Sequence, residues 1–370
     1  MQRRQFITGL AGILAASQSP MVLSSSATFT IGQSLPLSGS NAEFGLDVRE
    51  GVTSFITQHA KSGGAPRFVH ECLDDGNKAD KAAENTKLLL QNGANVLFGY
   101  GSATLSLPSI ALAEAAKTPF YAPFTGARSI QKSSSPWVFT ARASYDAEVQ
   151  RFAVALKQFK AQKVVIVHYG DPVGLENKAA CMETLSAAGL NAVGVAIKRN
   201  AEVGIEIAAA ITESQADVVL FTTLAAPSAK IFQDIKADEK SKVSYCVALS
   251  FAGPSQFQAL LGDKSRGIVV SHVVPPPWKF EFDIVREYQS AMKQAGSTRQ
   301  ATFAGLEAFV ALKGLEKALT KAKNSRGESL VAALSSTAGN FGGYPLDFTK
   351  NRHGGSYVDY IVITGKKSVA

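Results

Sequence analysis

Residues 95–107 read NVLFGYGSATLSL, and this stretch contains the unit from which the chain is built. The apolar run over 95–100 has the length and character of a buried strand. Glycine and hydroxyl residues follow over 101–104, and an apolar pattern with helical spacing then covers 107–116. The stretch therefore predicts a strand, a loop and a helix in immediate succession.

The same unit recurs along most of the chain. We expect further strands over 29–35, 67–73, 119–122, 164–168, 192–197, 218–222, 243–248 and 267–273. Helical patterns between them cover 46–60, 79–91, 146–160, 175–188, 205–214, 226–237 and 255–261. Strands that alternate with helices predict an α/β fold with doubly wound, Rossmann-like sheets and helices on both faces.

Two breaks in this alternation indicate two lobes joined by more than one crossing. The first lies around 133–136, before an extended segment over 137–142, and the second is the run of three prolines at 275–277. Helices over 281–295, 301–323 and 328–335 and strands near 344–348 and 357–364 complete the chain. We expect lobe 1 over 28–143 plus 276–350, and lobe 2 over 144–275 plus 351–370.

The first 27 residues have the features of an export signal. Arg3 and Arg4 precede an uncharged stretch over 6–14, and small residues at 25–27 suit cleavage near Ala27. The apolar run is far shorter than the roughly 20 residues that span a bilayer. We expect a periplasmic protein, exported by a twin-arginine-like or general secretory signal.

Charge and composition exclude several function classes. The chain has a formal net charge of +8, of which Arg3 and Arg4 supply two. The remaining basic residues are scattered, and the longest basic runs after residue 27 are the pairs 198–199 and 366–367. Because nucleic-acid binding needs a clustered basic surface, we expect no nucleic-acid partner. The positive balance mildly favours anionic solutes.

Signals for an enzyme are weak. The five histidines and three cysteines show no metal-ligand spacing, and neither a Gly-x-Ser-x-Gly elbow nor a complete dinucleotide fingerprint occurs. Cys72, Cys181 and Cys246 suit small buried apolar side chains, and Asp74 with Asp75 suits the cap of a helix that starts near Lys78. We expect no catalytic residues, metal or cofactor.

Three loops after predicted strands carry the residues of a candidate anion site. They cover 36–45, 99–104 and 122–127, and each combines glycine with hydroxyl residues before a helix. Ligands of such folds bind beyond the carboxyl ends of strands, where helix N-termini offer free N–H groups. Ser102, Thr104 and Thr125 could hold a carboxylate there, or could simply cap helices.

The order of these loops resembles that of the periplasmic branched-chain amino acid (Leu/Ile/Val) binding proteins, the type I solute receptors of ABC importers. The shared features include PLSG at 36–39, GSAT at 101–104, APFTGA at 122–127 and the segment 169–174. The resemblance covers nearly all of 28–370. It implies a two-lobed protein that closes on a small ligand by a hinge motion.

The resemblance also implies a set of ligand-binding residues. On lobe 1 these are Phe44, Ser102, Ala103, Thr104, Phe124, Thr125 and Gly126, and on lobe 2 they are Tyr169, Asp171, Leu224 and Ser250. Ser250 occupies the place of the acid that would meet the ammonium of an amino acid. Unless Asp171 or Glu307 reaches in from another element, an ammonium would be buried there unpaired at a high cost, so we expect a des-amino carboxylate, aromatic or aliphatic, to bind better.

The resemblance implies a function as well. We expect a monomeric solute-binding protein that delivers its carboxylate ligand to an ABC permease in the inner membrane. A ligand sensor of the same fold, which reports to a membrane signalling receptor, is the alternative. An enzyme is a third and weaker possibility, for the reasons given above.

Overall fold

The computed structural model describes residues 28–364 and 368–369. The expected signal peptide, residues 1–27, lies outside the described residues. Within the described ranges, the structure contains no helix with both the length and the apolar character needed to cross a membrane.

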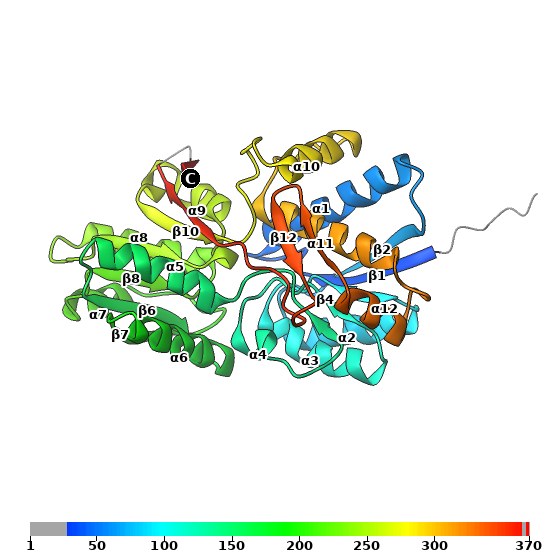
Figure 1. The fold of residues 1–370 in the computed structure, drawn as a ribbon. Coiled ribbons are helices and arrows are strands. Elements are labelled where there is room, and N and C mark those ends of the chain that lie inside the picture. The colour runs from blue at the N-terminus through cyan, green and yellow to red at the C-terminus, as the bar shows by residue number, and fades with distance from the viewer. Residues whose placement is uncertain (1–27, 365–367, 370) are drawn as a thin grey trace, which may run out of the picture.

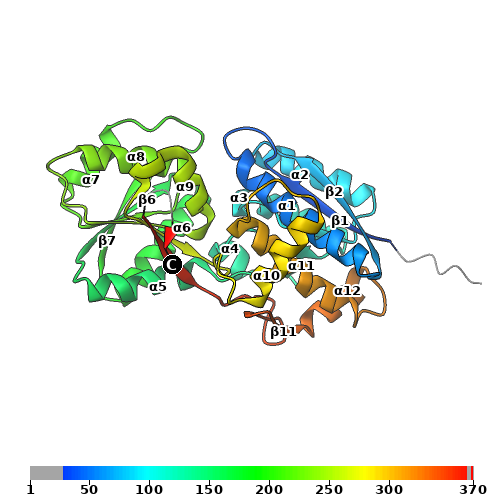
Figure 2. The same ribbon diagram turned by 90° about the horizontal axis from the view of Figure 1, so that it is seen from above.

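The chain folds into two α/β lobes, each built around its own sheet (Figure 1, Figure 2). The sheet of lobe 1 has the order β2-β1-β3-β4-β5, and all of its strands are parallel. These strands are β1 (Thr28–Leu35), β2 (Arg67–Asp74), β3 (Val96–Phe98), β4 (Phe120–Tyr121) and β5 (Val138–Phe139). The first strand lies inside the sheet, so the order reverses there, as in a doubly wound fold.

The sheet of lobe 2 has the order β14-β13-β10-β9-β8-β6-β7. Its parallel strands are β6 (Lys163–Tyr169), β7 (Asn191–Ile197), β8 (Val218–Phe221), β9 (Tyr245–Ala248) and β10 (Ile268–His272). The antiparallel strands β13 (Asp359–Ile363) and β14 (Ser368–Val369) complete one edge. The predicted α/β class with two doubly wound lobes is thus confirmed.

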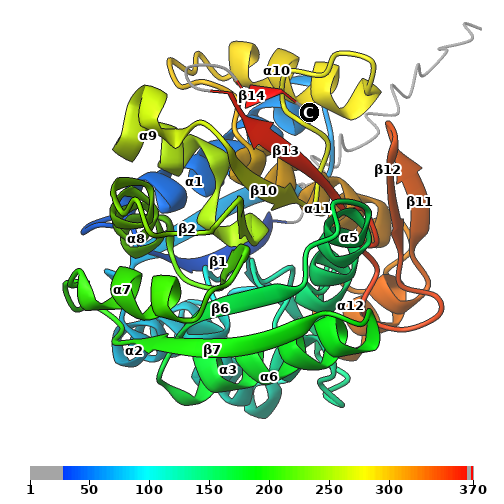
Figure 3. The ribbon, with the colours of Figure 1, turned by 90° about the vertical axis from the view of Figure 1, so that its left-hand side faces the viewer.

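Helices cover both faces of each sheet, as the apolar periodicity predicts. Lobe 2 carries α5 (Tyr145–Gln158) and α6 (Pro172–Ala187) on one face (Figure 3). The other face carries α7 (Glu206–Glu213), α8 (Ala225–Ala237) and α9 (Pro254–Leu261). Short 3₁₀ turns, η1 (Ser250–Ala252) and η2 (Gly262–Ser265), flank α9.

Lobe 1 receives helices from two distant parts of the chain. The first set is α1 (Ala42–Lys61), α2 (Ala79–Gln91), α3 (Ala103–Ala115) and α4 (Arg128–Gln131). The second set is α10 (Asp283–Gln294), α11 (Phe303–Leu319) and α12 (Gly327–Ser335), followed by the hairpin β11 (Ala338–Phe341) and β12 (Tyr344–Asp347). The helix predicted over 301–323 ends earlier, at Leu319, where the Thr320 hydroxyl donates to the Lys317 carbonyl.

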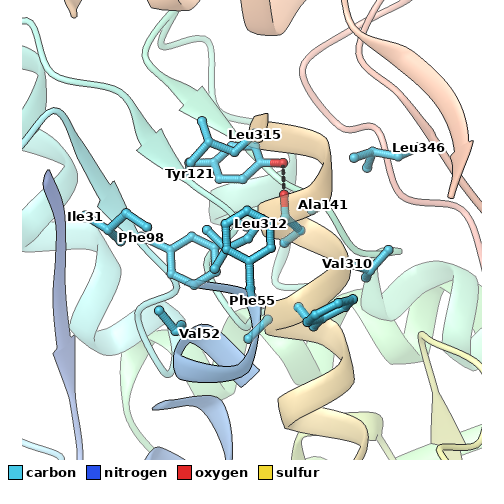
Figure 4. Packing of buried hydrophobic residues seen from close by; sticks show 14 of the residues in the cluster. Ile31, Val52, Phe55, Phe98, Tyr121, Ala141, Val310, Leu312, Leu315 and Leu346 are labelled. Carbon is cyan, nitrogen blue, oxygen red and sulfur yellow. Dashed lines mark hydrogen bonds between the residues drawn. The ribbon is translucent and has the colours of Figure 1, made fainter. Parts of the chain in front are cut away.

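The core of lobe 1 joins these two sets. Phe55, Phe98, Tyr121 and Leu312 are buried and pack together between α11 and the strands (Figure 4). The Tyr121 hydroxyl donates to the Ala311 carbonyl at 2.7 Å, so its one polar atom is satisfied inside the core. This packing fixes α11 against α1 and thereby places the N-terminal ends of both helices at the cleft between the lobes.

Three segments connect the lobes, over 140–144, 273–282 and 348–358. The first and third run side by side, because the Thr140 amide donates to the Arg352 carbonyl and the Gly354 amide donates to Thr140, both at 2.9 Å. The second and third segments come close to each other where β10 pairs with β13, with His272 opposite Asp359. Connections that are short and adjacent suit a hinge between two rigid bodies.

Candidate functional site

A large cleft of about 1140 Å³ lies between the two lobes. Lobe 1 contributes the start of α1, with Asn41 and Asp47, together with Arg299 and Thr302 before α11. Lobe 2 contributes Tyr169 at the end of β6, the start of α8 with Leu224, and part of α9. The cleft therefore lies beyond the carboxyl ends of strands from both sheets, where ligands of open α/β sheets bind.

A smaller cavity of about 50 Å³, here called the inner pocket, shares part of the wall of this cleft. Its wall brings together residues from both lobes. The lining residues are Asn41, Phe44, Asn77, Gly101, Ser102, Ala103, Thr104, Thr125, Tyr145, Tyr169, Val173, Asn177, Arg199, Thr222, Leu224 and Phe251. Seven of them belong to the set expected from the sequence, namely Phe44, Ser102, Ala103, Thr104, Thr125, Tyr169 and Leu224.

The N-terminus of α3 forms one side of the inner pocket. Ser102 is its N-cap, and its hydroxyl accepts a hydrogen bond from the Leu105 amide at 3.3 Å. The expectation of a capping role thus holds for Ser102. The amides of Ala103 and Thr104, in the first turn, have no partner inside the helix. The Thr104 hydroxyl makes no hydrogen bond with any described residue, so this side offers free donors.

Thr125 and Tyr145 form a pair of hydroxyls in the same wall. Their oxygens lie 3.2 Å apart, and Thr125 also accepts from the Ala127 amide at 3.3 Å. The two side chains carry two O–H hydrogens, and their mutual bond uses one of them. The other remains available to a ligand. Burial raises the pKa of Tyr145 to about 12, although Arg142 opposes this, so the phenol stays protonated at neutral pH.

Lobe 2 contributes a cation to the inner pocket. The guanidinium carbon of Arg199 lies 3.8 Å from the centre of the Tyr169 ring, and its Nε donates to Asp171 at 2.6 Å. The Tyr169 hydroxyl in turn accepts from the Leu224 amide at 3.1 Å. Tyr169, Leu224 and Arg199 thus form one connected set of side chains and backbone on the lobe 2 wall.

Four residues of the expected set do not line the inner pocket. Asp171 lies behind Arg199 and caps α6 by accepting from the Gly174 amide at 2.9 Å. Gly126 packs against Tyr145, where a Cβ would lie 2.6 Å from the Tyr145 nitrogen. Phe124 and Ser250 instead line a neighbouring cavity of about 30 Å³.

This neighbouring cavity, here called the hinge pocket, is next to a buried charge cluster. Arg142 lies in the first crossing segment, Glu148 on α5 and Glu307 on α11, and all three are buried. Arg142 is 3.6 Å from the Glu148 carboxylate and 3.5 Å from that of Glu307. The cluster therefore spans the junction of the two lobes, and two carboxylates lie close to one guanidinium.

Ser250 belongs to this cluster and has an acid directly behind it. Its amide and hydroxyl donate to the Glu148 carboxylate at 2.8 and 2.9 Å, and Ser271 donates to the same carboxylate. Arg142 also contacts the Ser250 hydroxyl. Glu148 thus accepts three hydrogen bonds from its own lobe, and Ser250 lies directly against this carboxylate.

Glu307 is the less satisfied carboxylate of the cluster. Burial raises its pKa to about 7, the charge of Arg142 opposes this, and the charge of Glu148 adds to it. The physical reason is that two carboxylates share one cation inside a site with little water. Near neutral pH, Glu307 carries only part of a negative charge.

The expectation for Asp74 and Asp75 was wrong. The helix α2 begins at Ala79 without a side-chain cap, so neither carboxylate caps it. Asp74 instead accepts from the Leu37 amide at 2.8 Å, and Asp75 accepts from the Ser34 hydroxyl at 2.8 Å. Adjacent strand-end carboxylates here hold the loop between β1 and α1, which carries Asn41 and Phe44 to the cleft.

None of the three cysteines lines the cleft or either of the smaller cavities. Cys181 and Cys246 are buried and Cys72 is partly exposed, and all three are free thiols. Burial raises the pKa of each thiol to about 12, so none is a thiolate at neutral pH. Across residues 28–364 and 368–369, no three His, Cys, Asp or Glu side chains form a metal-binding group.

Several pocket residues were not anticipated from the sequence. Arg199 lies two residues after β7 and Thr222 directly follows β8, so attention to every strand end could have found them. Tyr145, Asn177 and Phe251 lie on α5, α6 and η1, and only the packing of the lobes brings them to the pocket.

Two α/β lobes, three crossings and a cleft lined from both sides define a bilobal ligand-binding protein. The sequence profile of the periplasmic binding protein family matches residues 28–362, and the chain belongs to that family. This confirms the resemblance found in the sequence. Among curated proteins, no relative matches the chain.

Solved structures with the same fold cover nearly the whole chain. A possible leucine/isoleucine/valine-binding protein from Rhodopirellula baltica SH 1 is 24% identical, with a TM-score of 0.84 over 94% of this chain and 97% of that one. An ABC transporter solute-binding protein from R. palustris in complex with benzoate is 18% identical, with a TM-score of 0.79 over 93% and 95%. One from Rhodopseudomonas palustris BisB5 in complex with 3,4-dihydroxy benzoic acid is 18% identical, with a TM-score of 0.75 over 90% and 93%.

Proposed function

We propose that the chain is the periplasmic solute-binding protein of an ABC importer and captures a small carboxylate between its lobes. The proposal takes lobe 1 as 28–143 plus 276–350 and lobe 2 as 144–275 plus 351–370. One observation carries the proposal. The inner pocket is lined from both lobes by hydroxyls, amides and Arg199, and no acidic residue lies in its wall.

The donors of the inner pocket suit an anion. The first turn of α3 supplies the amides of Ala103 and Thr104 and the Thr104 hydroxyl, and the pair Thr125–Tyr145 supplies one more O–H. A hydrogen bond to a charged group contributes roughly 1.5–3 kcal/mol, and a helix N-terminus adds favourable potential. A carboxylate accepts several such bonds at once, since its two oxygens offer about four lone-pair sites.

The remaining walls suit an apolar or aromatic ligand body. Phe44 and Phe251 line both the inner pocket and the hinge pocket, and Phe124 packs edge-on against Phe44 with ring centres 5.6 Å apart. A flat apolar group could contact these rings while its carboxylate reaches the donors. The benzoate and dihydroxybenzoate complexes of structural neighbours support this class of ligand.

An amino acid fits the inner pocket less well, because no carboxylate lines its wall and the nearby buried ones already have partners. Glu148 is saturated behind Ser250, Glu307 is paired with Arg142, and Asp171 is bound to Arg199. Among the acids that line the large cleft, Glu43 and Asp47 accept from Arg299, and Glu202 is exposed on the segment after β7 and does not line the inner pocket. A zwitterion would therefore compete with an existing cation or bury its positive end unpaired.

The large volume of the cleft supports capture of the ligand by closure of the two lobes. At about 1140 Å³ it exceeds the roughly 300–1000 Å³ typical of ligand pockets. Rotation about the three crossings would bring Tyr169, Leu224 and Arg199 towards the α3 terminus and exclude water. In this proposal the protein acts as a monomer, performs no chemistry on its ligand, and presents the closed form to an ABC permease.

Calorimetry tests the proposed ligand class. Residues 28–370 are titrated with leucine and its des-amino analogue 4-methylpentanoate, with phenylalanine and 3-phenylpropanoate, and with benzoate. We expect at least one of the three acids to bind. In the leucine and phenylalanine pairs, the des-amino acid should bind at least tenfold tighter than its amino acid, because the ammonium of the amino acid would be unpaired. Tighter binding of the amino acids would contradict this and would make Glu307 the first acid to replace.

A further inference from the structure

Arg199 occupies a fixed position in the lobe 2 wall. It follows the last strand residue of β7, Ile197, and only about a quarter of its side chain is exposed. The Tyr169 ring lies against one face of the guanidinium at 3.8 Å, and the Asp171 carboxylate holds Nε at 2.6 Å. Asp171 is itself held by the Gly174 amide at the start of α6. The orientation of the guanidinium is therefore set by groups that belong to secondary structure.

These contacts use only part of the hydrogen-bonding capacity of Arg199. A guanidinium has five N–H donors, and the bond to Asp171 uses the one on Nε. The terminal N–H groups make no hydrogen bond with any other residue in the described part of the chain. An arginine that is oriented on two sides and has unused terminal donors at a pocket wall is suited to bind a planar anion.

The inner pocket brings this arginine towards the donors of lobe 1. Thr104 and Thr125 line the same small cavity, whose volume of about 50 Å³ leaves room for one anionic group between the two sides. A carboxylate can accept from hydroxyls and amides on one edge and from a guanidinium on the other. The two lobes would then meet on a single group of the ligand.

We propose that Arg199 is a specificity-determining residue that binds the ligand carboxylate from lobe 2, opposite Thr104 and Thr125 of lobe 1. Asp171 and Tyr169 are positioning residues that orient it. This inference rests on the proposed function and adds to it how the site distinguishes an acid from a neutral molecule. A carboxamide of the same shape presents an NH₂ group to the Arg199 guanidinium, which can only donate, and two facing donors repel.

The test compares each acid with its own amide. The native protein and the variants Arg199→Gln and Arg199→Lys are titrated with benzoate and benzamide, 3-phenylpropanoate and 3-phenylpropanamide, and 4-methylpentanoate and 4-methylpentanamide. We expect the native protein to prefer the acid of a bound pair at least tenfold. Arg199→Gln should reduce that preference at least tenfold by weakening the acid alone, and Arg199→Lys should retain part of it.

Arg266→Gln is the matched control. Arg266 is an exposed arginine of lobe 2, it carries the same charge, and it lines none of the three cavities. Its loss should change acid binding less than threefold, and that change should disappear in high salt. The melting temperature of each ligand-free variant shows whether the fold is retained. If Arg199→Gln lowers the melting temperature, the comparison is made with Arg199→Lys instead.

The outcomes separate the two proposals. If acids bind the native protein but Arg199→Gln and Arg266→Gln behave alike, the role of Arg199 is overturned while the proposed function stands. An equal loss for acid and amide in Arg199→Gln would likewise overturn it, because that result indicates only a structural role. If no acid binds the native protein, the proposed function itself fails, and the role of Arg199 fails with it.

Discussion

Replacing Arg142 with methionine is expected to lower the free energy of unfolding at pH 7 by about 3–5 kcal/mol. The variant keeps the length and apolar stem of the side chain but leaves Glu148 and Glu307 buried without a cation. Both carboxylates now lie within 3.6 Å of the Arg142 guanidinium. Urea unfolding of residues 28–370, followed by circular dichroism, measures the change.

Arg151→Met provides the control for this prediction. Arg151 pairs with Asp359 at 3.3 Å, but about half of its side chain is exposed. An exposed ion pair contributes about 1 kcal/mol or less, so this variant should unfold almost like the native protein. If Arg142→Met were no less stable than Arg151→Met, the cluster would not stabilise the junction between the lobes.

The double variant Thr104→Val, Thr125→Val is expected to weaken binding of the preferred acid by about a hundredfold. Each substitution removes a hydroxyl donor at nearly constant shape, and each lost bond to a carboxylate costs roughly 1.5 kcal/mol or more, which is about tenfold in affinity. Thr104 has no internal hydrogen bond among the described residues, so Thr104→Val tests the ligand contact without disturbing the fold.

Thr125→Val alone should weaken binding about tenfold or more, and it also removes the partner of the Tyr145 hydroxyl. The melting temperature of the ligand-free protein separates these two effects. Thr53→Val, an exposed threonine on α1 away from all three cavities, is the control and should bind the acid like the native protein. Unchanged affinity in the double variant would place the carboxylate elsewhere in the cleft.

The fold was accessible from the sequence because its signal is local. Buried parallel strands leave apolar runs, and amphipathic helices leave a helical period, so α2 begins and ends at the residues that were predicted. Two of the three crossings, over 140–144 and 273–282, lie at or shortly after breaks in that alternation. The strand β11, over Ala338–Phe341, was missed because these four residues have neither an apolar run nor an alternating pattern.

The lobe 1 part of the candidate site was partly predictable for the same reason. Ser102, Thr104 and Thr125 follow strands directly, and the carboxyl ends of parallel strands meet at one edge of a sheet. The lobe 2 part was harder to predict. Arg199 lies in an ordinary basic pair, and its orientation comes from Asp171 and Tyr169, 28 and 30 positions earlier in the chain.

Of the charge cluster at the hinge, only Glu307 was considered from the sequence, as an acid that could reach towards Ser250, and its pairing with Arg142 was not predicted. Arg142 and Glu307 are 165 positions apart, and each lies in a segment whose local pattern gives no indication of a buried charge. Such long-range pairs depend on how the lobes pack, and packing leaves no periodic trace in the sequence. The same reason hid Glu148, which looked like an ordinary acidic residue in the first turn of a helix.

Small-angle scattering tests the central claim most directly, namely that the two lobes close on a small carboxylate. Residues 28–370 are measured alone and with a saturating amount of whichever of benzoate, 3-phenylpropanoate and 4-methylpentanoate binds most tightly. Closure of a cleft of about 1140 Å³ predicts a smaller radius of gyration with the acid and no change with its amide at the same concentration. An unchanged radius of gyration at saturation with the acid would contradict the account.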